Sequence, residues 1–567
     1  MIDTLPDNYE VALDWGHDDW KPYFDALLES ELTADTVDTW LQNRDKVTRL
    51  MFEVGARIRV ATTVDTTDEV AENRLKKFMG EVNPEAQKVN FELDKRLVES
   101  GLAPDELKIP LRNVEASLKL FREENLPLIT KLSNLNMQYN KIAGAQTVEW
   151  EGEERTLSQM YPLLKSTDRE VREKVYHLIQ NRIKADREAY NDLWRELMDT
   201  RKQMVENAGL DNYRQYAWLD RNRHDYSPED ALEFTEAIAS VAVPANERRL
   251  EKARKKMGYD SLKPWDASVD PDGREPLKAY ETVEEFINKS EAVFNQVDPE
   301  LGSYFKTMKD ENLLDLENRK GKGPGGYCTY FALSERPFIF MNAVGFDSDV
   351  RVLLHEAGHA FHGFSRGETN YMMQRQSPME FNEVASMAME LLASPYVTEE
   401  HGGFFTEDEA ARYRIDHLNN IIRFWPYMAV VVEFQHWIYT HHDEATNPDN
   451  CDKKWLELWD KFMTGVDYSG YEDFVVNMWR RQIHIFGYPF YYVEYGLAQL
   501  GSVQVWANAL KDQASALQKY RDALALGGTV TLPELYETAG AKLAFDSGTL
   551  GEAVKLIENT IGELETV

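Results

Sequence analysis

The sequence has few cysteines and no apolar run that could span a membrane. Only Cys328 and Cys451 occur in 567 residues, and so sparse a pair predicts reduced thiols in the cytoplasm rather than a disulfide framework. The longest uncharged apolar run, Tyr427–Val432, is much shorter than the roughly 20 residues that a spanning helix needs. The first ten residues, MIDTLPDNYE, lack a basic-then-apolar stretch, so no secretory signal is expected. We therefore expect a cytoplasmic protein.

Positive charge is also scarce. The chain has 64 basic and 98 acidic residues, which gives a formal charge of −34. This balance disfavours nucleic acid and anionic membranes as partners. The apolar content of 43% is enough for several packed subdomains.

Strand signals are few, and helical periodicity dominates. The residues from 168 to 208 lack Gly and Pro and show a 3.6-residue apolar period, which predicts one helix. The clearest strand is Pro337–Gly345, short, apolar and bounded by Pro and Gly. The glycine-rich stretch before it, Arg319–Cys328, lacks the P-loop order and is interpreted as a surface loop.

The segment Leu353–His362, LLHEAGHAFH, holds three of the twelve histidines. His355 and His359 are four apart, so a helix stacks them on one face about 6 Å apart. Two such imidazoles can bind one tetrahedral ion, with Glu356 beside the open position. Chance gives HExxH in roughly a few per cent of such sequences, so the motif needs supporting context. His362 lies about 10 Å along the axis from His355, too far to share a small ion, and is interpreted as a wall or supporting residue.

The next helix offers a third ligand. Ser377 is predicted as its N-cap and Glu380 as the capping-box partner. Glu383 follows one turn later, beside small residues that would let two helices approach closely. Glu390 shares its face and is placed to hold a ligand histidine. The flanking VASMAMELLA is apolar, and because buried acids need partners, a metal ion is expected here.

These motifs together resemble a known family. HEAGHAFH followed by FNEVASMAMELL, with Glu383 28 residues after His355, is similar to the thimet oligopeptidase and oligoendopeptidase F group of zinc metallopeptidases, closer to the oligoendopeptidase F branch. The stretches at 207–234, at Pro337–Gly345 and HIFGYPFYYVEYGLAQL agree with it. The resemblance implies a mostly α, two-lobed, multi-helical zincin-like peptidase with a deep central channel and a small β-sheet beside the active-site helix.

The resemblance also implies how the chain is organised and which residues act. It places an N-terminal helical lobe over about 1–200 and the catalytic region over 201–567. It implies one Zn²⁺ per chain, held by His355, His359 and Glu383, with Glu356 as catalytic base. The expected activity is hydrolysis of internal bonds in short unstructured peptides. A monomer and a homodimer are both compatible with the sequence.

The C-terminal segment has its own signal. It carries one histidine and four tyrosines at helical intervals, interrupted by Pro489: His484, Tyr488, Tyr491, Tyr492 and Tyr495. Such a stripe is more often core than chemistry, but buried hydroxyls need partners. An oxyanion that develops during a reaction would be such a partner, and the resemblance assigns His484, Tyr492 and Tyr495 to donate hydrogen bonds to it. We also expect the strand 338–343 to pair with the substrate backbone.

Two alternatives remain open at this point. Glu356-x-x-His359 and Glu433-x-x-His436 are both the pair used by helical di-iron carboxylate proteins, which would make the chain an oxidase with two irons. A non-enzymatic scaffold with structural zinc is the other alternative. It is less favoured, because structural zinc sites close all four positions, often with cysteines, and neither cysteine lies near such a cluster.

Overall fold

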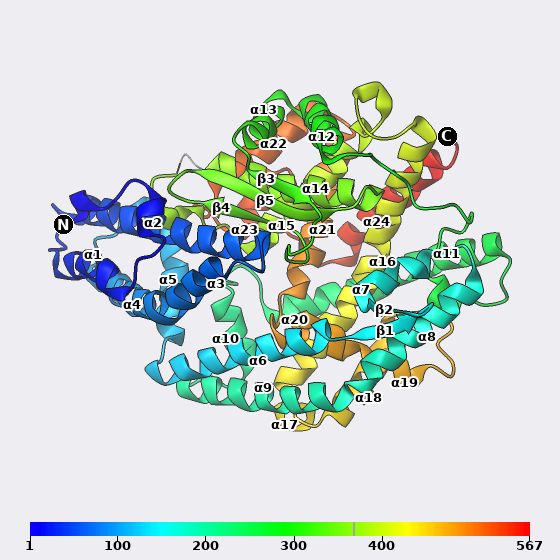
Figure 1. Cartoon of the computed structure of the whole chain (residues 1–567), viewed down its shortest axis with the longest axis horizontal. Coiled ribbons are helices and arrows are strands. Elements are labelled where there is room, and N and C mark those ends of the chain that lie inside the picture. The colour runs from blue at the N-terminus through cyan, green and yellow to red at the C-terminus, as the bar shows by residue number, and fades with distance from the viewer. Residues whose placement is uncertain (367–368) are drawn as a thin grey trace.

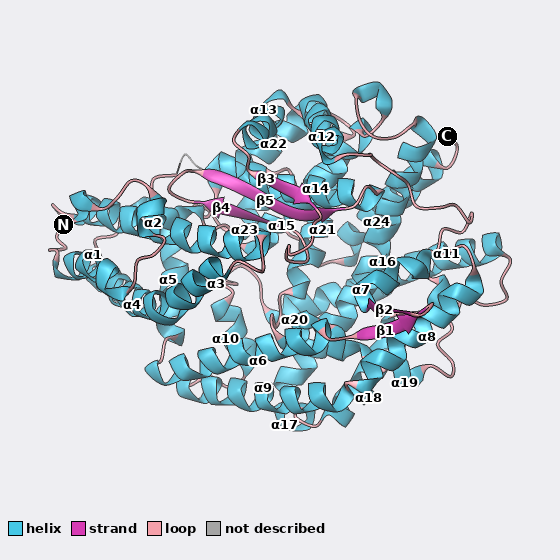
Figure 2. Ribbon diagram, in the orientation of Figure 1, coloured by secondary structure: helices cyan, strands magenta, loops and turns pink. Residues whose placement is uncertain are grey.

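Helices dominate the fold, and the mostly α prediction is confirmed. The computed structural model describes residues 1–366 and 369–567, and its helices accompany two small β-sheets (Figures 1 and 2). Within those ranges, no helix is long and apolar enough to cross a membrane.

The N-terminal part has a separate apolar core. Trp20 and Trp40 are almost fully buried in a cluster that extends from Ile2 to Leu107 and includes few residues from elsewhere. Three helices supply most of it: α1 (His17–Glu29), α2 (Val37–Val64) and α4 (Asn83–Ser100). The main core lies in the rest of the chain. The lobe boundary near residue 200 stays a prediction.

The longest helix connects an upper and a lower group of elements. Figure 1 shows an upper group of elements that contains the three-stranded sheet and a lower group that contains α6 and α9, and α16 runs from one to the other. At 34 residues, α16 is about 51 Å long. The bounds of these helices are α6 (Leu126–Gly144), α9 (Arg187–Ala208) and α16 (Glu407–Thr440).

The three-stranded sheet lies beside the histidine helix, α14 (Asp347–Ser365). Its order is β3-β5-β4. The predicted strand is confirmed as β5 (Arg336–Ala343), but it is the central strand, paired on both sides by β3 (Leu314–Glu317) and β4 (Tyr327–Phe331). The expectation that 338–343 pairs with a substrate is therefore wrong, because its backbone groups already serve the sheet. The free edge next to α14 belongs to β4.

The predicted helix over 168–208 is interrupted. It forms α8 (Arg169–Ala185) and α9, with Asp186 between them. The Asp186 carboxylate accepts hydrogen bonds from Gln146 and Arg182, each at 2.8 Å. The tertiary contact with Gln146 accompanies this interruption, which the local pattern does not predict.

Candidate active site

Two histidines of α14 face one carboxylate of the next helix. His355 and His359 lie one turn apart with ring centroids separated by 5.0 Å. Their Nε2 atoms lie 3.5 and 3.8 Å from Oε2 of Glu383 on α15 (Met379–Ala393). Ligands about 2.1 Å from a tetrahedral ion would lie about 3.4 Å apart. The three side chains thus fit a single small cation.

Small residues allow the two helices to approach. A Cβ on Gly358 would lie 2.5 Å from the Cα of Ser386 and 2.6 Å from the carbonyl oxygen of Ala385. Any side chain at 358 would push α15 away and separate Glu383 from the histidines. The close approach expected from the small residues near Glu383 is therefore present.

A second carboxylate holds one of the histidines. Oε1 of Glu390 lies 2.7 Å from Nδ1 of His355, and its Oε2 lies 3.0 Å from Nε2 of His417 on α16. This leaves His355 Nε2 directed toward Glu383. Glu390 was expected from the sequence, but His417 was missed, since it belongs to no motif and comes close only through folding.

The site is rich in buried carboxylates and lacks permanent positive charge. Glu356, Glu383 and Glu390 are all buried, and none forms an ion pair with Lys or Arg in the described part of the chain. Burial lowers the pKa of His355, but the hydrogen bonds that its ring donates to Glu383 and Glu390 outweigh burial and hold that pKa well above its usual value. Buried anions need a compensating cation, and a divalent metal has the right charge.

Glu356 lies between the histidines on α14 and faces the sheet edge. The backbone N–H of Cys328, in β4, faces its carboxylate and favours the charged form. Burial raises the pKa of Glu356 to about 7, with Glu383 adding to the effect and His355 opposing it. A carboxyl group with a pKa near neutrality can both accept and return a proton.

The tyrosine segment reaches the same site. Its helix, α21 (Tyr492–Ala509), begins after a short turn. The hydroxyl of Tyr491 donates to Oε1 of Glu383 at 3.0 Å. His484 lies within 4.8 to 6.1 Å, centroid to centroid, of four tyrosine rings: Tyr488, Tyr491, Tyr492 and Tyr495. Its Nδ1 hydrogen-bonds to Gln482, a residue the sequence did not single out.

The predicted helix cap before Glu383 is wrong. The N-cap position of α15 is Pro378, without a side-chain hydrogen bond. Ser377 instead hydrogen-bonds to Nε2 of His362 at 3.2 Å, and Glu380 is buried, accepting from the Tyr226 hydroxyl at 2.6 Å. Tertiary partners have replaced the local cap. His362 is itself buried against Phe381 and lies outside the His355–His359–Glu383 group.

The second Glu-x-x-His pair does not join this group. Glu433 accepts from Thr235 at 3.0 Å and Lys461 at 2.8 Å. His436 packs against the rings of Trp218 and Phe490. Among the described residues, only the His355–His359–Glu383 set has metal-binding spacing. The four-carboxylate arrangement of a di-iron site is therefore not formed.

Known proteins resemble the chain over most of its length. It is 21% identical over 410 residues to oligoendopeptidase F, chromosomal, of Lactococcus lactis subsp. cremoris, a match that covers 71% of this chain and 65% of that protein, slightly less than two thirds of its length. The structure of PZ peptidase A with an inhibitor has a TM-score of 0.88 and 26% identity, covering 100% of this chain and 99% of that one. A provisionally assigned oligoendopeptidase F has a TM-score of 0.88 and 27% identity, covering 98% and 97% of the two chains.

A family model also matches the chain. The description "Peptidase family M3" applies to residues 162–553, more than half of the chain. The matched range contains all the side chains that converge at the histidine helix. The chain belongs to peptidase family M3.

Proposed function

We propose that the chain is a zinc-dependent oligoendopeptidase that hydrolyses internal bonds of short unstructured peptides. His355, His359 and Glu383 would hold one Zn²⁺ per chain. The observation that carries this proposal is the convergence of two half-buried histidines and one buried carboxylate, beside glutamates that form no ion pair with Lys or Arg among the described residues. The family and the oligoendopeptidase F relative support the same activity.

Glu356 is the proposed general base. A divalent ion held by these residues would supply a Lewis acid for the scissile carbonyl and would make water more acidic. Glu356 takes the proton of the attacking water and later delivers it to the leaving amine. Its raised pKa, about 7, suits this exchange, because the carboxyl group can both take up and release a proton near neutral pH. The Cys328 backbone N–H, which faces the carboxylate, favours one orientation.

The tyrosine segment supplies donors for the developing oxyanion. We assign Tyr495, Tyr492 and His484 to this role, since they cluster beside the group that contains Tyr491 and Glu383. Burial raises the pKa of Tyr492 to about 12, so its hydroxyl keeps its proton and can donate at neutral pH. Tyr491, which bonds to Glu383, is better placed to orient that carboxylate.

Substrates would enter as extended peptides between the two lobes. The free edge of β4 can pair with a peptide backbone irrespective of its side chains, which is suited to a broad range of sequences. A deep channel that excludes folded proteins, and a cytoplasmic location, remain parts of this proposal.

The test is cleavage of a quenched fluorescent peptide by wild type and Glu356→Gln, with bound metal measured in both. Removal of the base should lower kcat by about 10²- to 10⁴-fold and leave the zinc content unchanged. Glu433→Gln is the matched control, because it alters the other Glu-x-x-His pair, and it should keep its activity. Full activity in Glu356→Gln would refute the proposed mechanism, and two bound irons would revive the oxidase.

A further inference from the structure

A strained turn precedes the tyrosine helix α21. Pro489 and Phe490 lie between the short helix α20 (Ile483–Phe486) and the start of α21. Phe490 has a φ of 63°, in the left-handed region that disfavours bulky side chains. Such a backbone persists only where surrounding contacts hold it. Because Tyr491 and Tyr492 follow directly, the conformation of this turn decides where their side chains lie.

Two arginines from a distant part of the chain hold this turn. They follow α10 (Tyr213–Asp220) and lie 268 and 267 residues before their partners. Arg221 donates from Nε to the carbonyl oxygen of Pro489 at 2.7 Å. Arg223 donates to the carbonyl oxygen of Phe490. Two consecutive carbonyl groups of the strained turn are thus bound by charged donors.

Carboxylates within the protein hold both arginines in place. Oε1 of Glu494, on α21, lies 2.6 Å from Nη2 of Arg223 and 3.5 Å from Nη1 of Arg221. Oε1 of Glu380 lies 3.5 Å from Nε of Arg223 and accepts a hydrogen bond from the Tyr226 hydroxyl at 2.6 Å. Arg223 and both carboxylates are buried. Two arginines face two carboxylates here, so the cluster supports the turn and needs no further anion.

The same turn is tied to His484. Gln435, on α16, accepts a hydrogen bond from the Phe490 N–H at 3.1 Å and donates to the carbonyl oxygen of His484 at 2.9 Å. The histidine, the turn and the start of α21 are therefore connected through side chains as well as through the chain.

Arg221 also faces the aromatic group itself. Its guanidinium lies 5.1 Å from the centroid of the Tyr491 ring, within the range of a cation–π contact. The Tyr491 hydroxyl in turn donates to Glu383 at 3.0 Å. Burial, together with the charge of Arg221, lowers the pKa of His484 to about 4, so this ring is uncharged at neutral pH. A continuous set of contacts runs from Arg221 to the proposed metal ligand.

We propose that Arg221 and Arg223 are positioning residues for the tyrosine segment. By holding two consecutive carbonyl groups of the strained turn, they fix the start of α21 and with it the places of Tyr491, Tyr492 and Tyr495. Neither arginine has to touch the substrate for this. The inference rests on the proposed function, which gives these tyrosines their chemistry, and it assigns a role to a segment without a catalytic motif.

Arg221→Met in the full-length protein is the first test. The Arg221 side chain is 18% exposed, so its loss disturbs the core less than loss of buried Arg223. With saturating Zn²⁺, kcat should fall at least about tenfold, the effect of losing a charged hydrogen bond. KM should stay within about twofold, because the interactions lost belong to the transition state. A wild-type kcat in Arg221→Met would overturn the proposal.

The matched control is Arg112→Met. Arg112, on α5 (Lys108–Leu120), is also half-buried and lies 2.6 Å from Asp225, two residues after Arg223. It therefore supports the same segment without binding the turn, and its replacement should leave kcat and KM unchanged. An equal loss of kcat in both variants would mean that general support of the segment, and not the hold on the turn, is what matters.

A double-mutant cycle shows whether Arg221 acts through the tyrosines. In a Tyr492→Phe/Tyr495→Phe background, adding Arg221→Met should lower kcat by no more than about twofold, because the groups it positions have lost their hydroxyls. A further loss as large as that in wild type would show that Arg221 acts by another route. If the background itself cleaved like wild type, the oxyanion role would be refuted, and this inference with it.

Hydrogen exchange gives a measurement that needs no turnover. The backbone amides of residues 488–496 should exchange at least about tenfold faster in Arg221→Met than in wild type or Arg112→Met, since local opening of the turn costs less. Arg223→Lys, which keeps a buried charge but loses the planar fork, should act in the same direction. Unchanged exchange in both arginine variants would overturn the positioning role even if kcat fell. The proposed function fails separately, if wild type cleaves no peptide while the exchange rates change as expected.

Discussion

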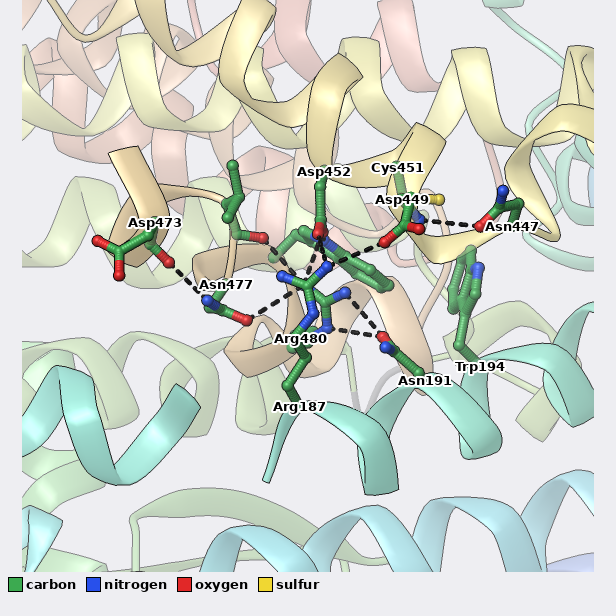
Figure 3. A network of polar contacts seen from close by, with 12 residues as sticks. Arg187, Asn191, Trp194, Asn447, Asp449, Cys451, Asp452, Asp473, Asn477 and Arg480 are labelled. Carbon is green, nitrogen blue, oxygen red and sulfur yellow. Dashed lines mark hydrogen bonds and ion pairs between the residues drawn. The ribbon is translucent and has the colours of Figure 1, made fainter. Parts of the chain in front are cut away.

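Two polar clusters of this molecule contain buried carboxylates, and these carboxylates have different partners in each. In the lower group of elements, which contains α9, Arg480 donates to Asp452 at 2.7 Å and to Asn191 at 2.9 and 2.7 Å. Arg187 and the Trp479 indole also bind Asp452 (Figure 3). At the histidine helix, Glu356, Glu383 and Glu390 face imidazoles and a tyrosine, without Lys or Arg partners in the described residues.

This difference in pairing distinguishes a cluster that stabilises the fold from one that is suited to binding and chemistry. The Arg480 cluster is saturated, since its charges and hydrogen bonds are matched within the protein, and it ties α9 to α18 (Pro448–Phe462) and the segment before His484. The histidine cluster, by contrast, could hold a metal ion, and its buried carboxylates have no Lys or Arg ion pair among the described residues. A cluster that is incomplete by itself is expected to bind something, whereas a complete one stabilises the fold.

The largest expected effect comes from removing the metal. A chelator should lower kcat/KM at least about a thousandfold, because several kcal/mol of transition-state stabilisation are lost, and Zn²⁺ should restore it. The Arg480 cluster needs no metal, so far-ultraviolet circular dichroism should show that the helices persist. Unchanged cleavage in the metal-free protein would remove the distinction between the clusters.

The Arg480 cluster should show the opposite pattern. Arg480→Met leaves a buried carboxylate short of a partner and should lower the free energy of unfolding by about 3 kcal/mol, measured by urea denaturation. Metal content and kcat of the folded protein should stay the same. The control is Arg195→Met on α9, the helix that carries Asn191, because the ion pair of Arg195 is exposed and contributes less than about 1 kcal/mol. Loss of zinc in Arg480→Met would mean that the clusters are coupled.

The sequence predicts the parts of these clusters that are close together in the chain. His355, Glu356 and His359 follow from a four-residue spacing, and Glu383 follows from the apolar helix after them, with which the family resemblance agrees. His417 could not be predicted, because it approaches Glu390 only when α16 packs beside α15. The position of β5 was predicted correctly but its pairing was not, since strand order depends on distant partners. Ser377 failed as a cap for a similar reason: its bond to His362 is tertiary.

Glu390 tests whether supporting contacts matter within the histidine cluster. Glu390→Gln keeps the shape but removes the charge that faces His355 and His417, and should weaken zinc binding by about 10- to 100-fold. Competition with a chromogenic chelator measures this affinity. Glu399→Gln, an exposed change shortly after α15, should have no effect. Wild-type affinity in Glu390→Gln would show that helix packing alone positions His355.

The smallest effects should separate the tyrosines from one another. Tyr491→Phe removes the donor to Glu383 and should weaken zinc binding by only about 3- to 10-fold. Tyr495→Phe should leave zinc binding unchanged and lower kcat, because its proposed partner is the oxyanion. Tyr488 is 53% exposed, and Tyr488→Phe serves as the control. If Tyr495→Phe left kcat unchanged, its oxyanion role would be wrong. If it weakened zinc binding as Tyr491→Phe does, the tyrosines would act as one scaffold for Glu383. The histidine cluster would then resemble the Arg480 cluster more closely, since its own contacts would hold its members in place.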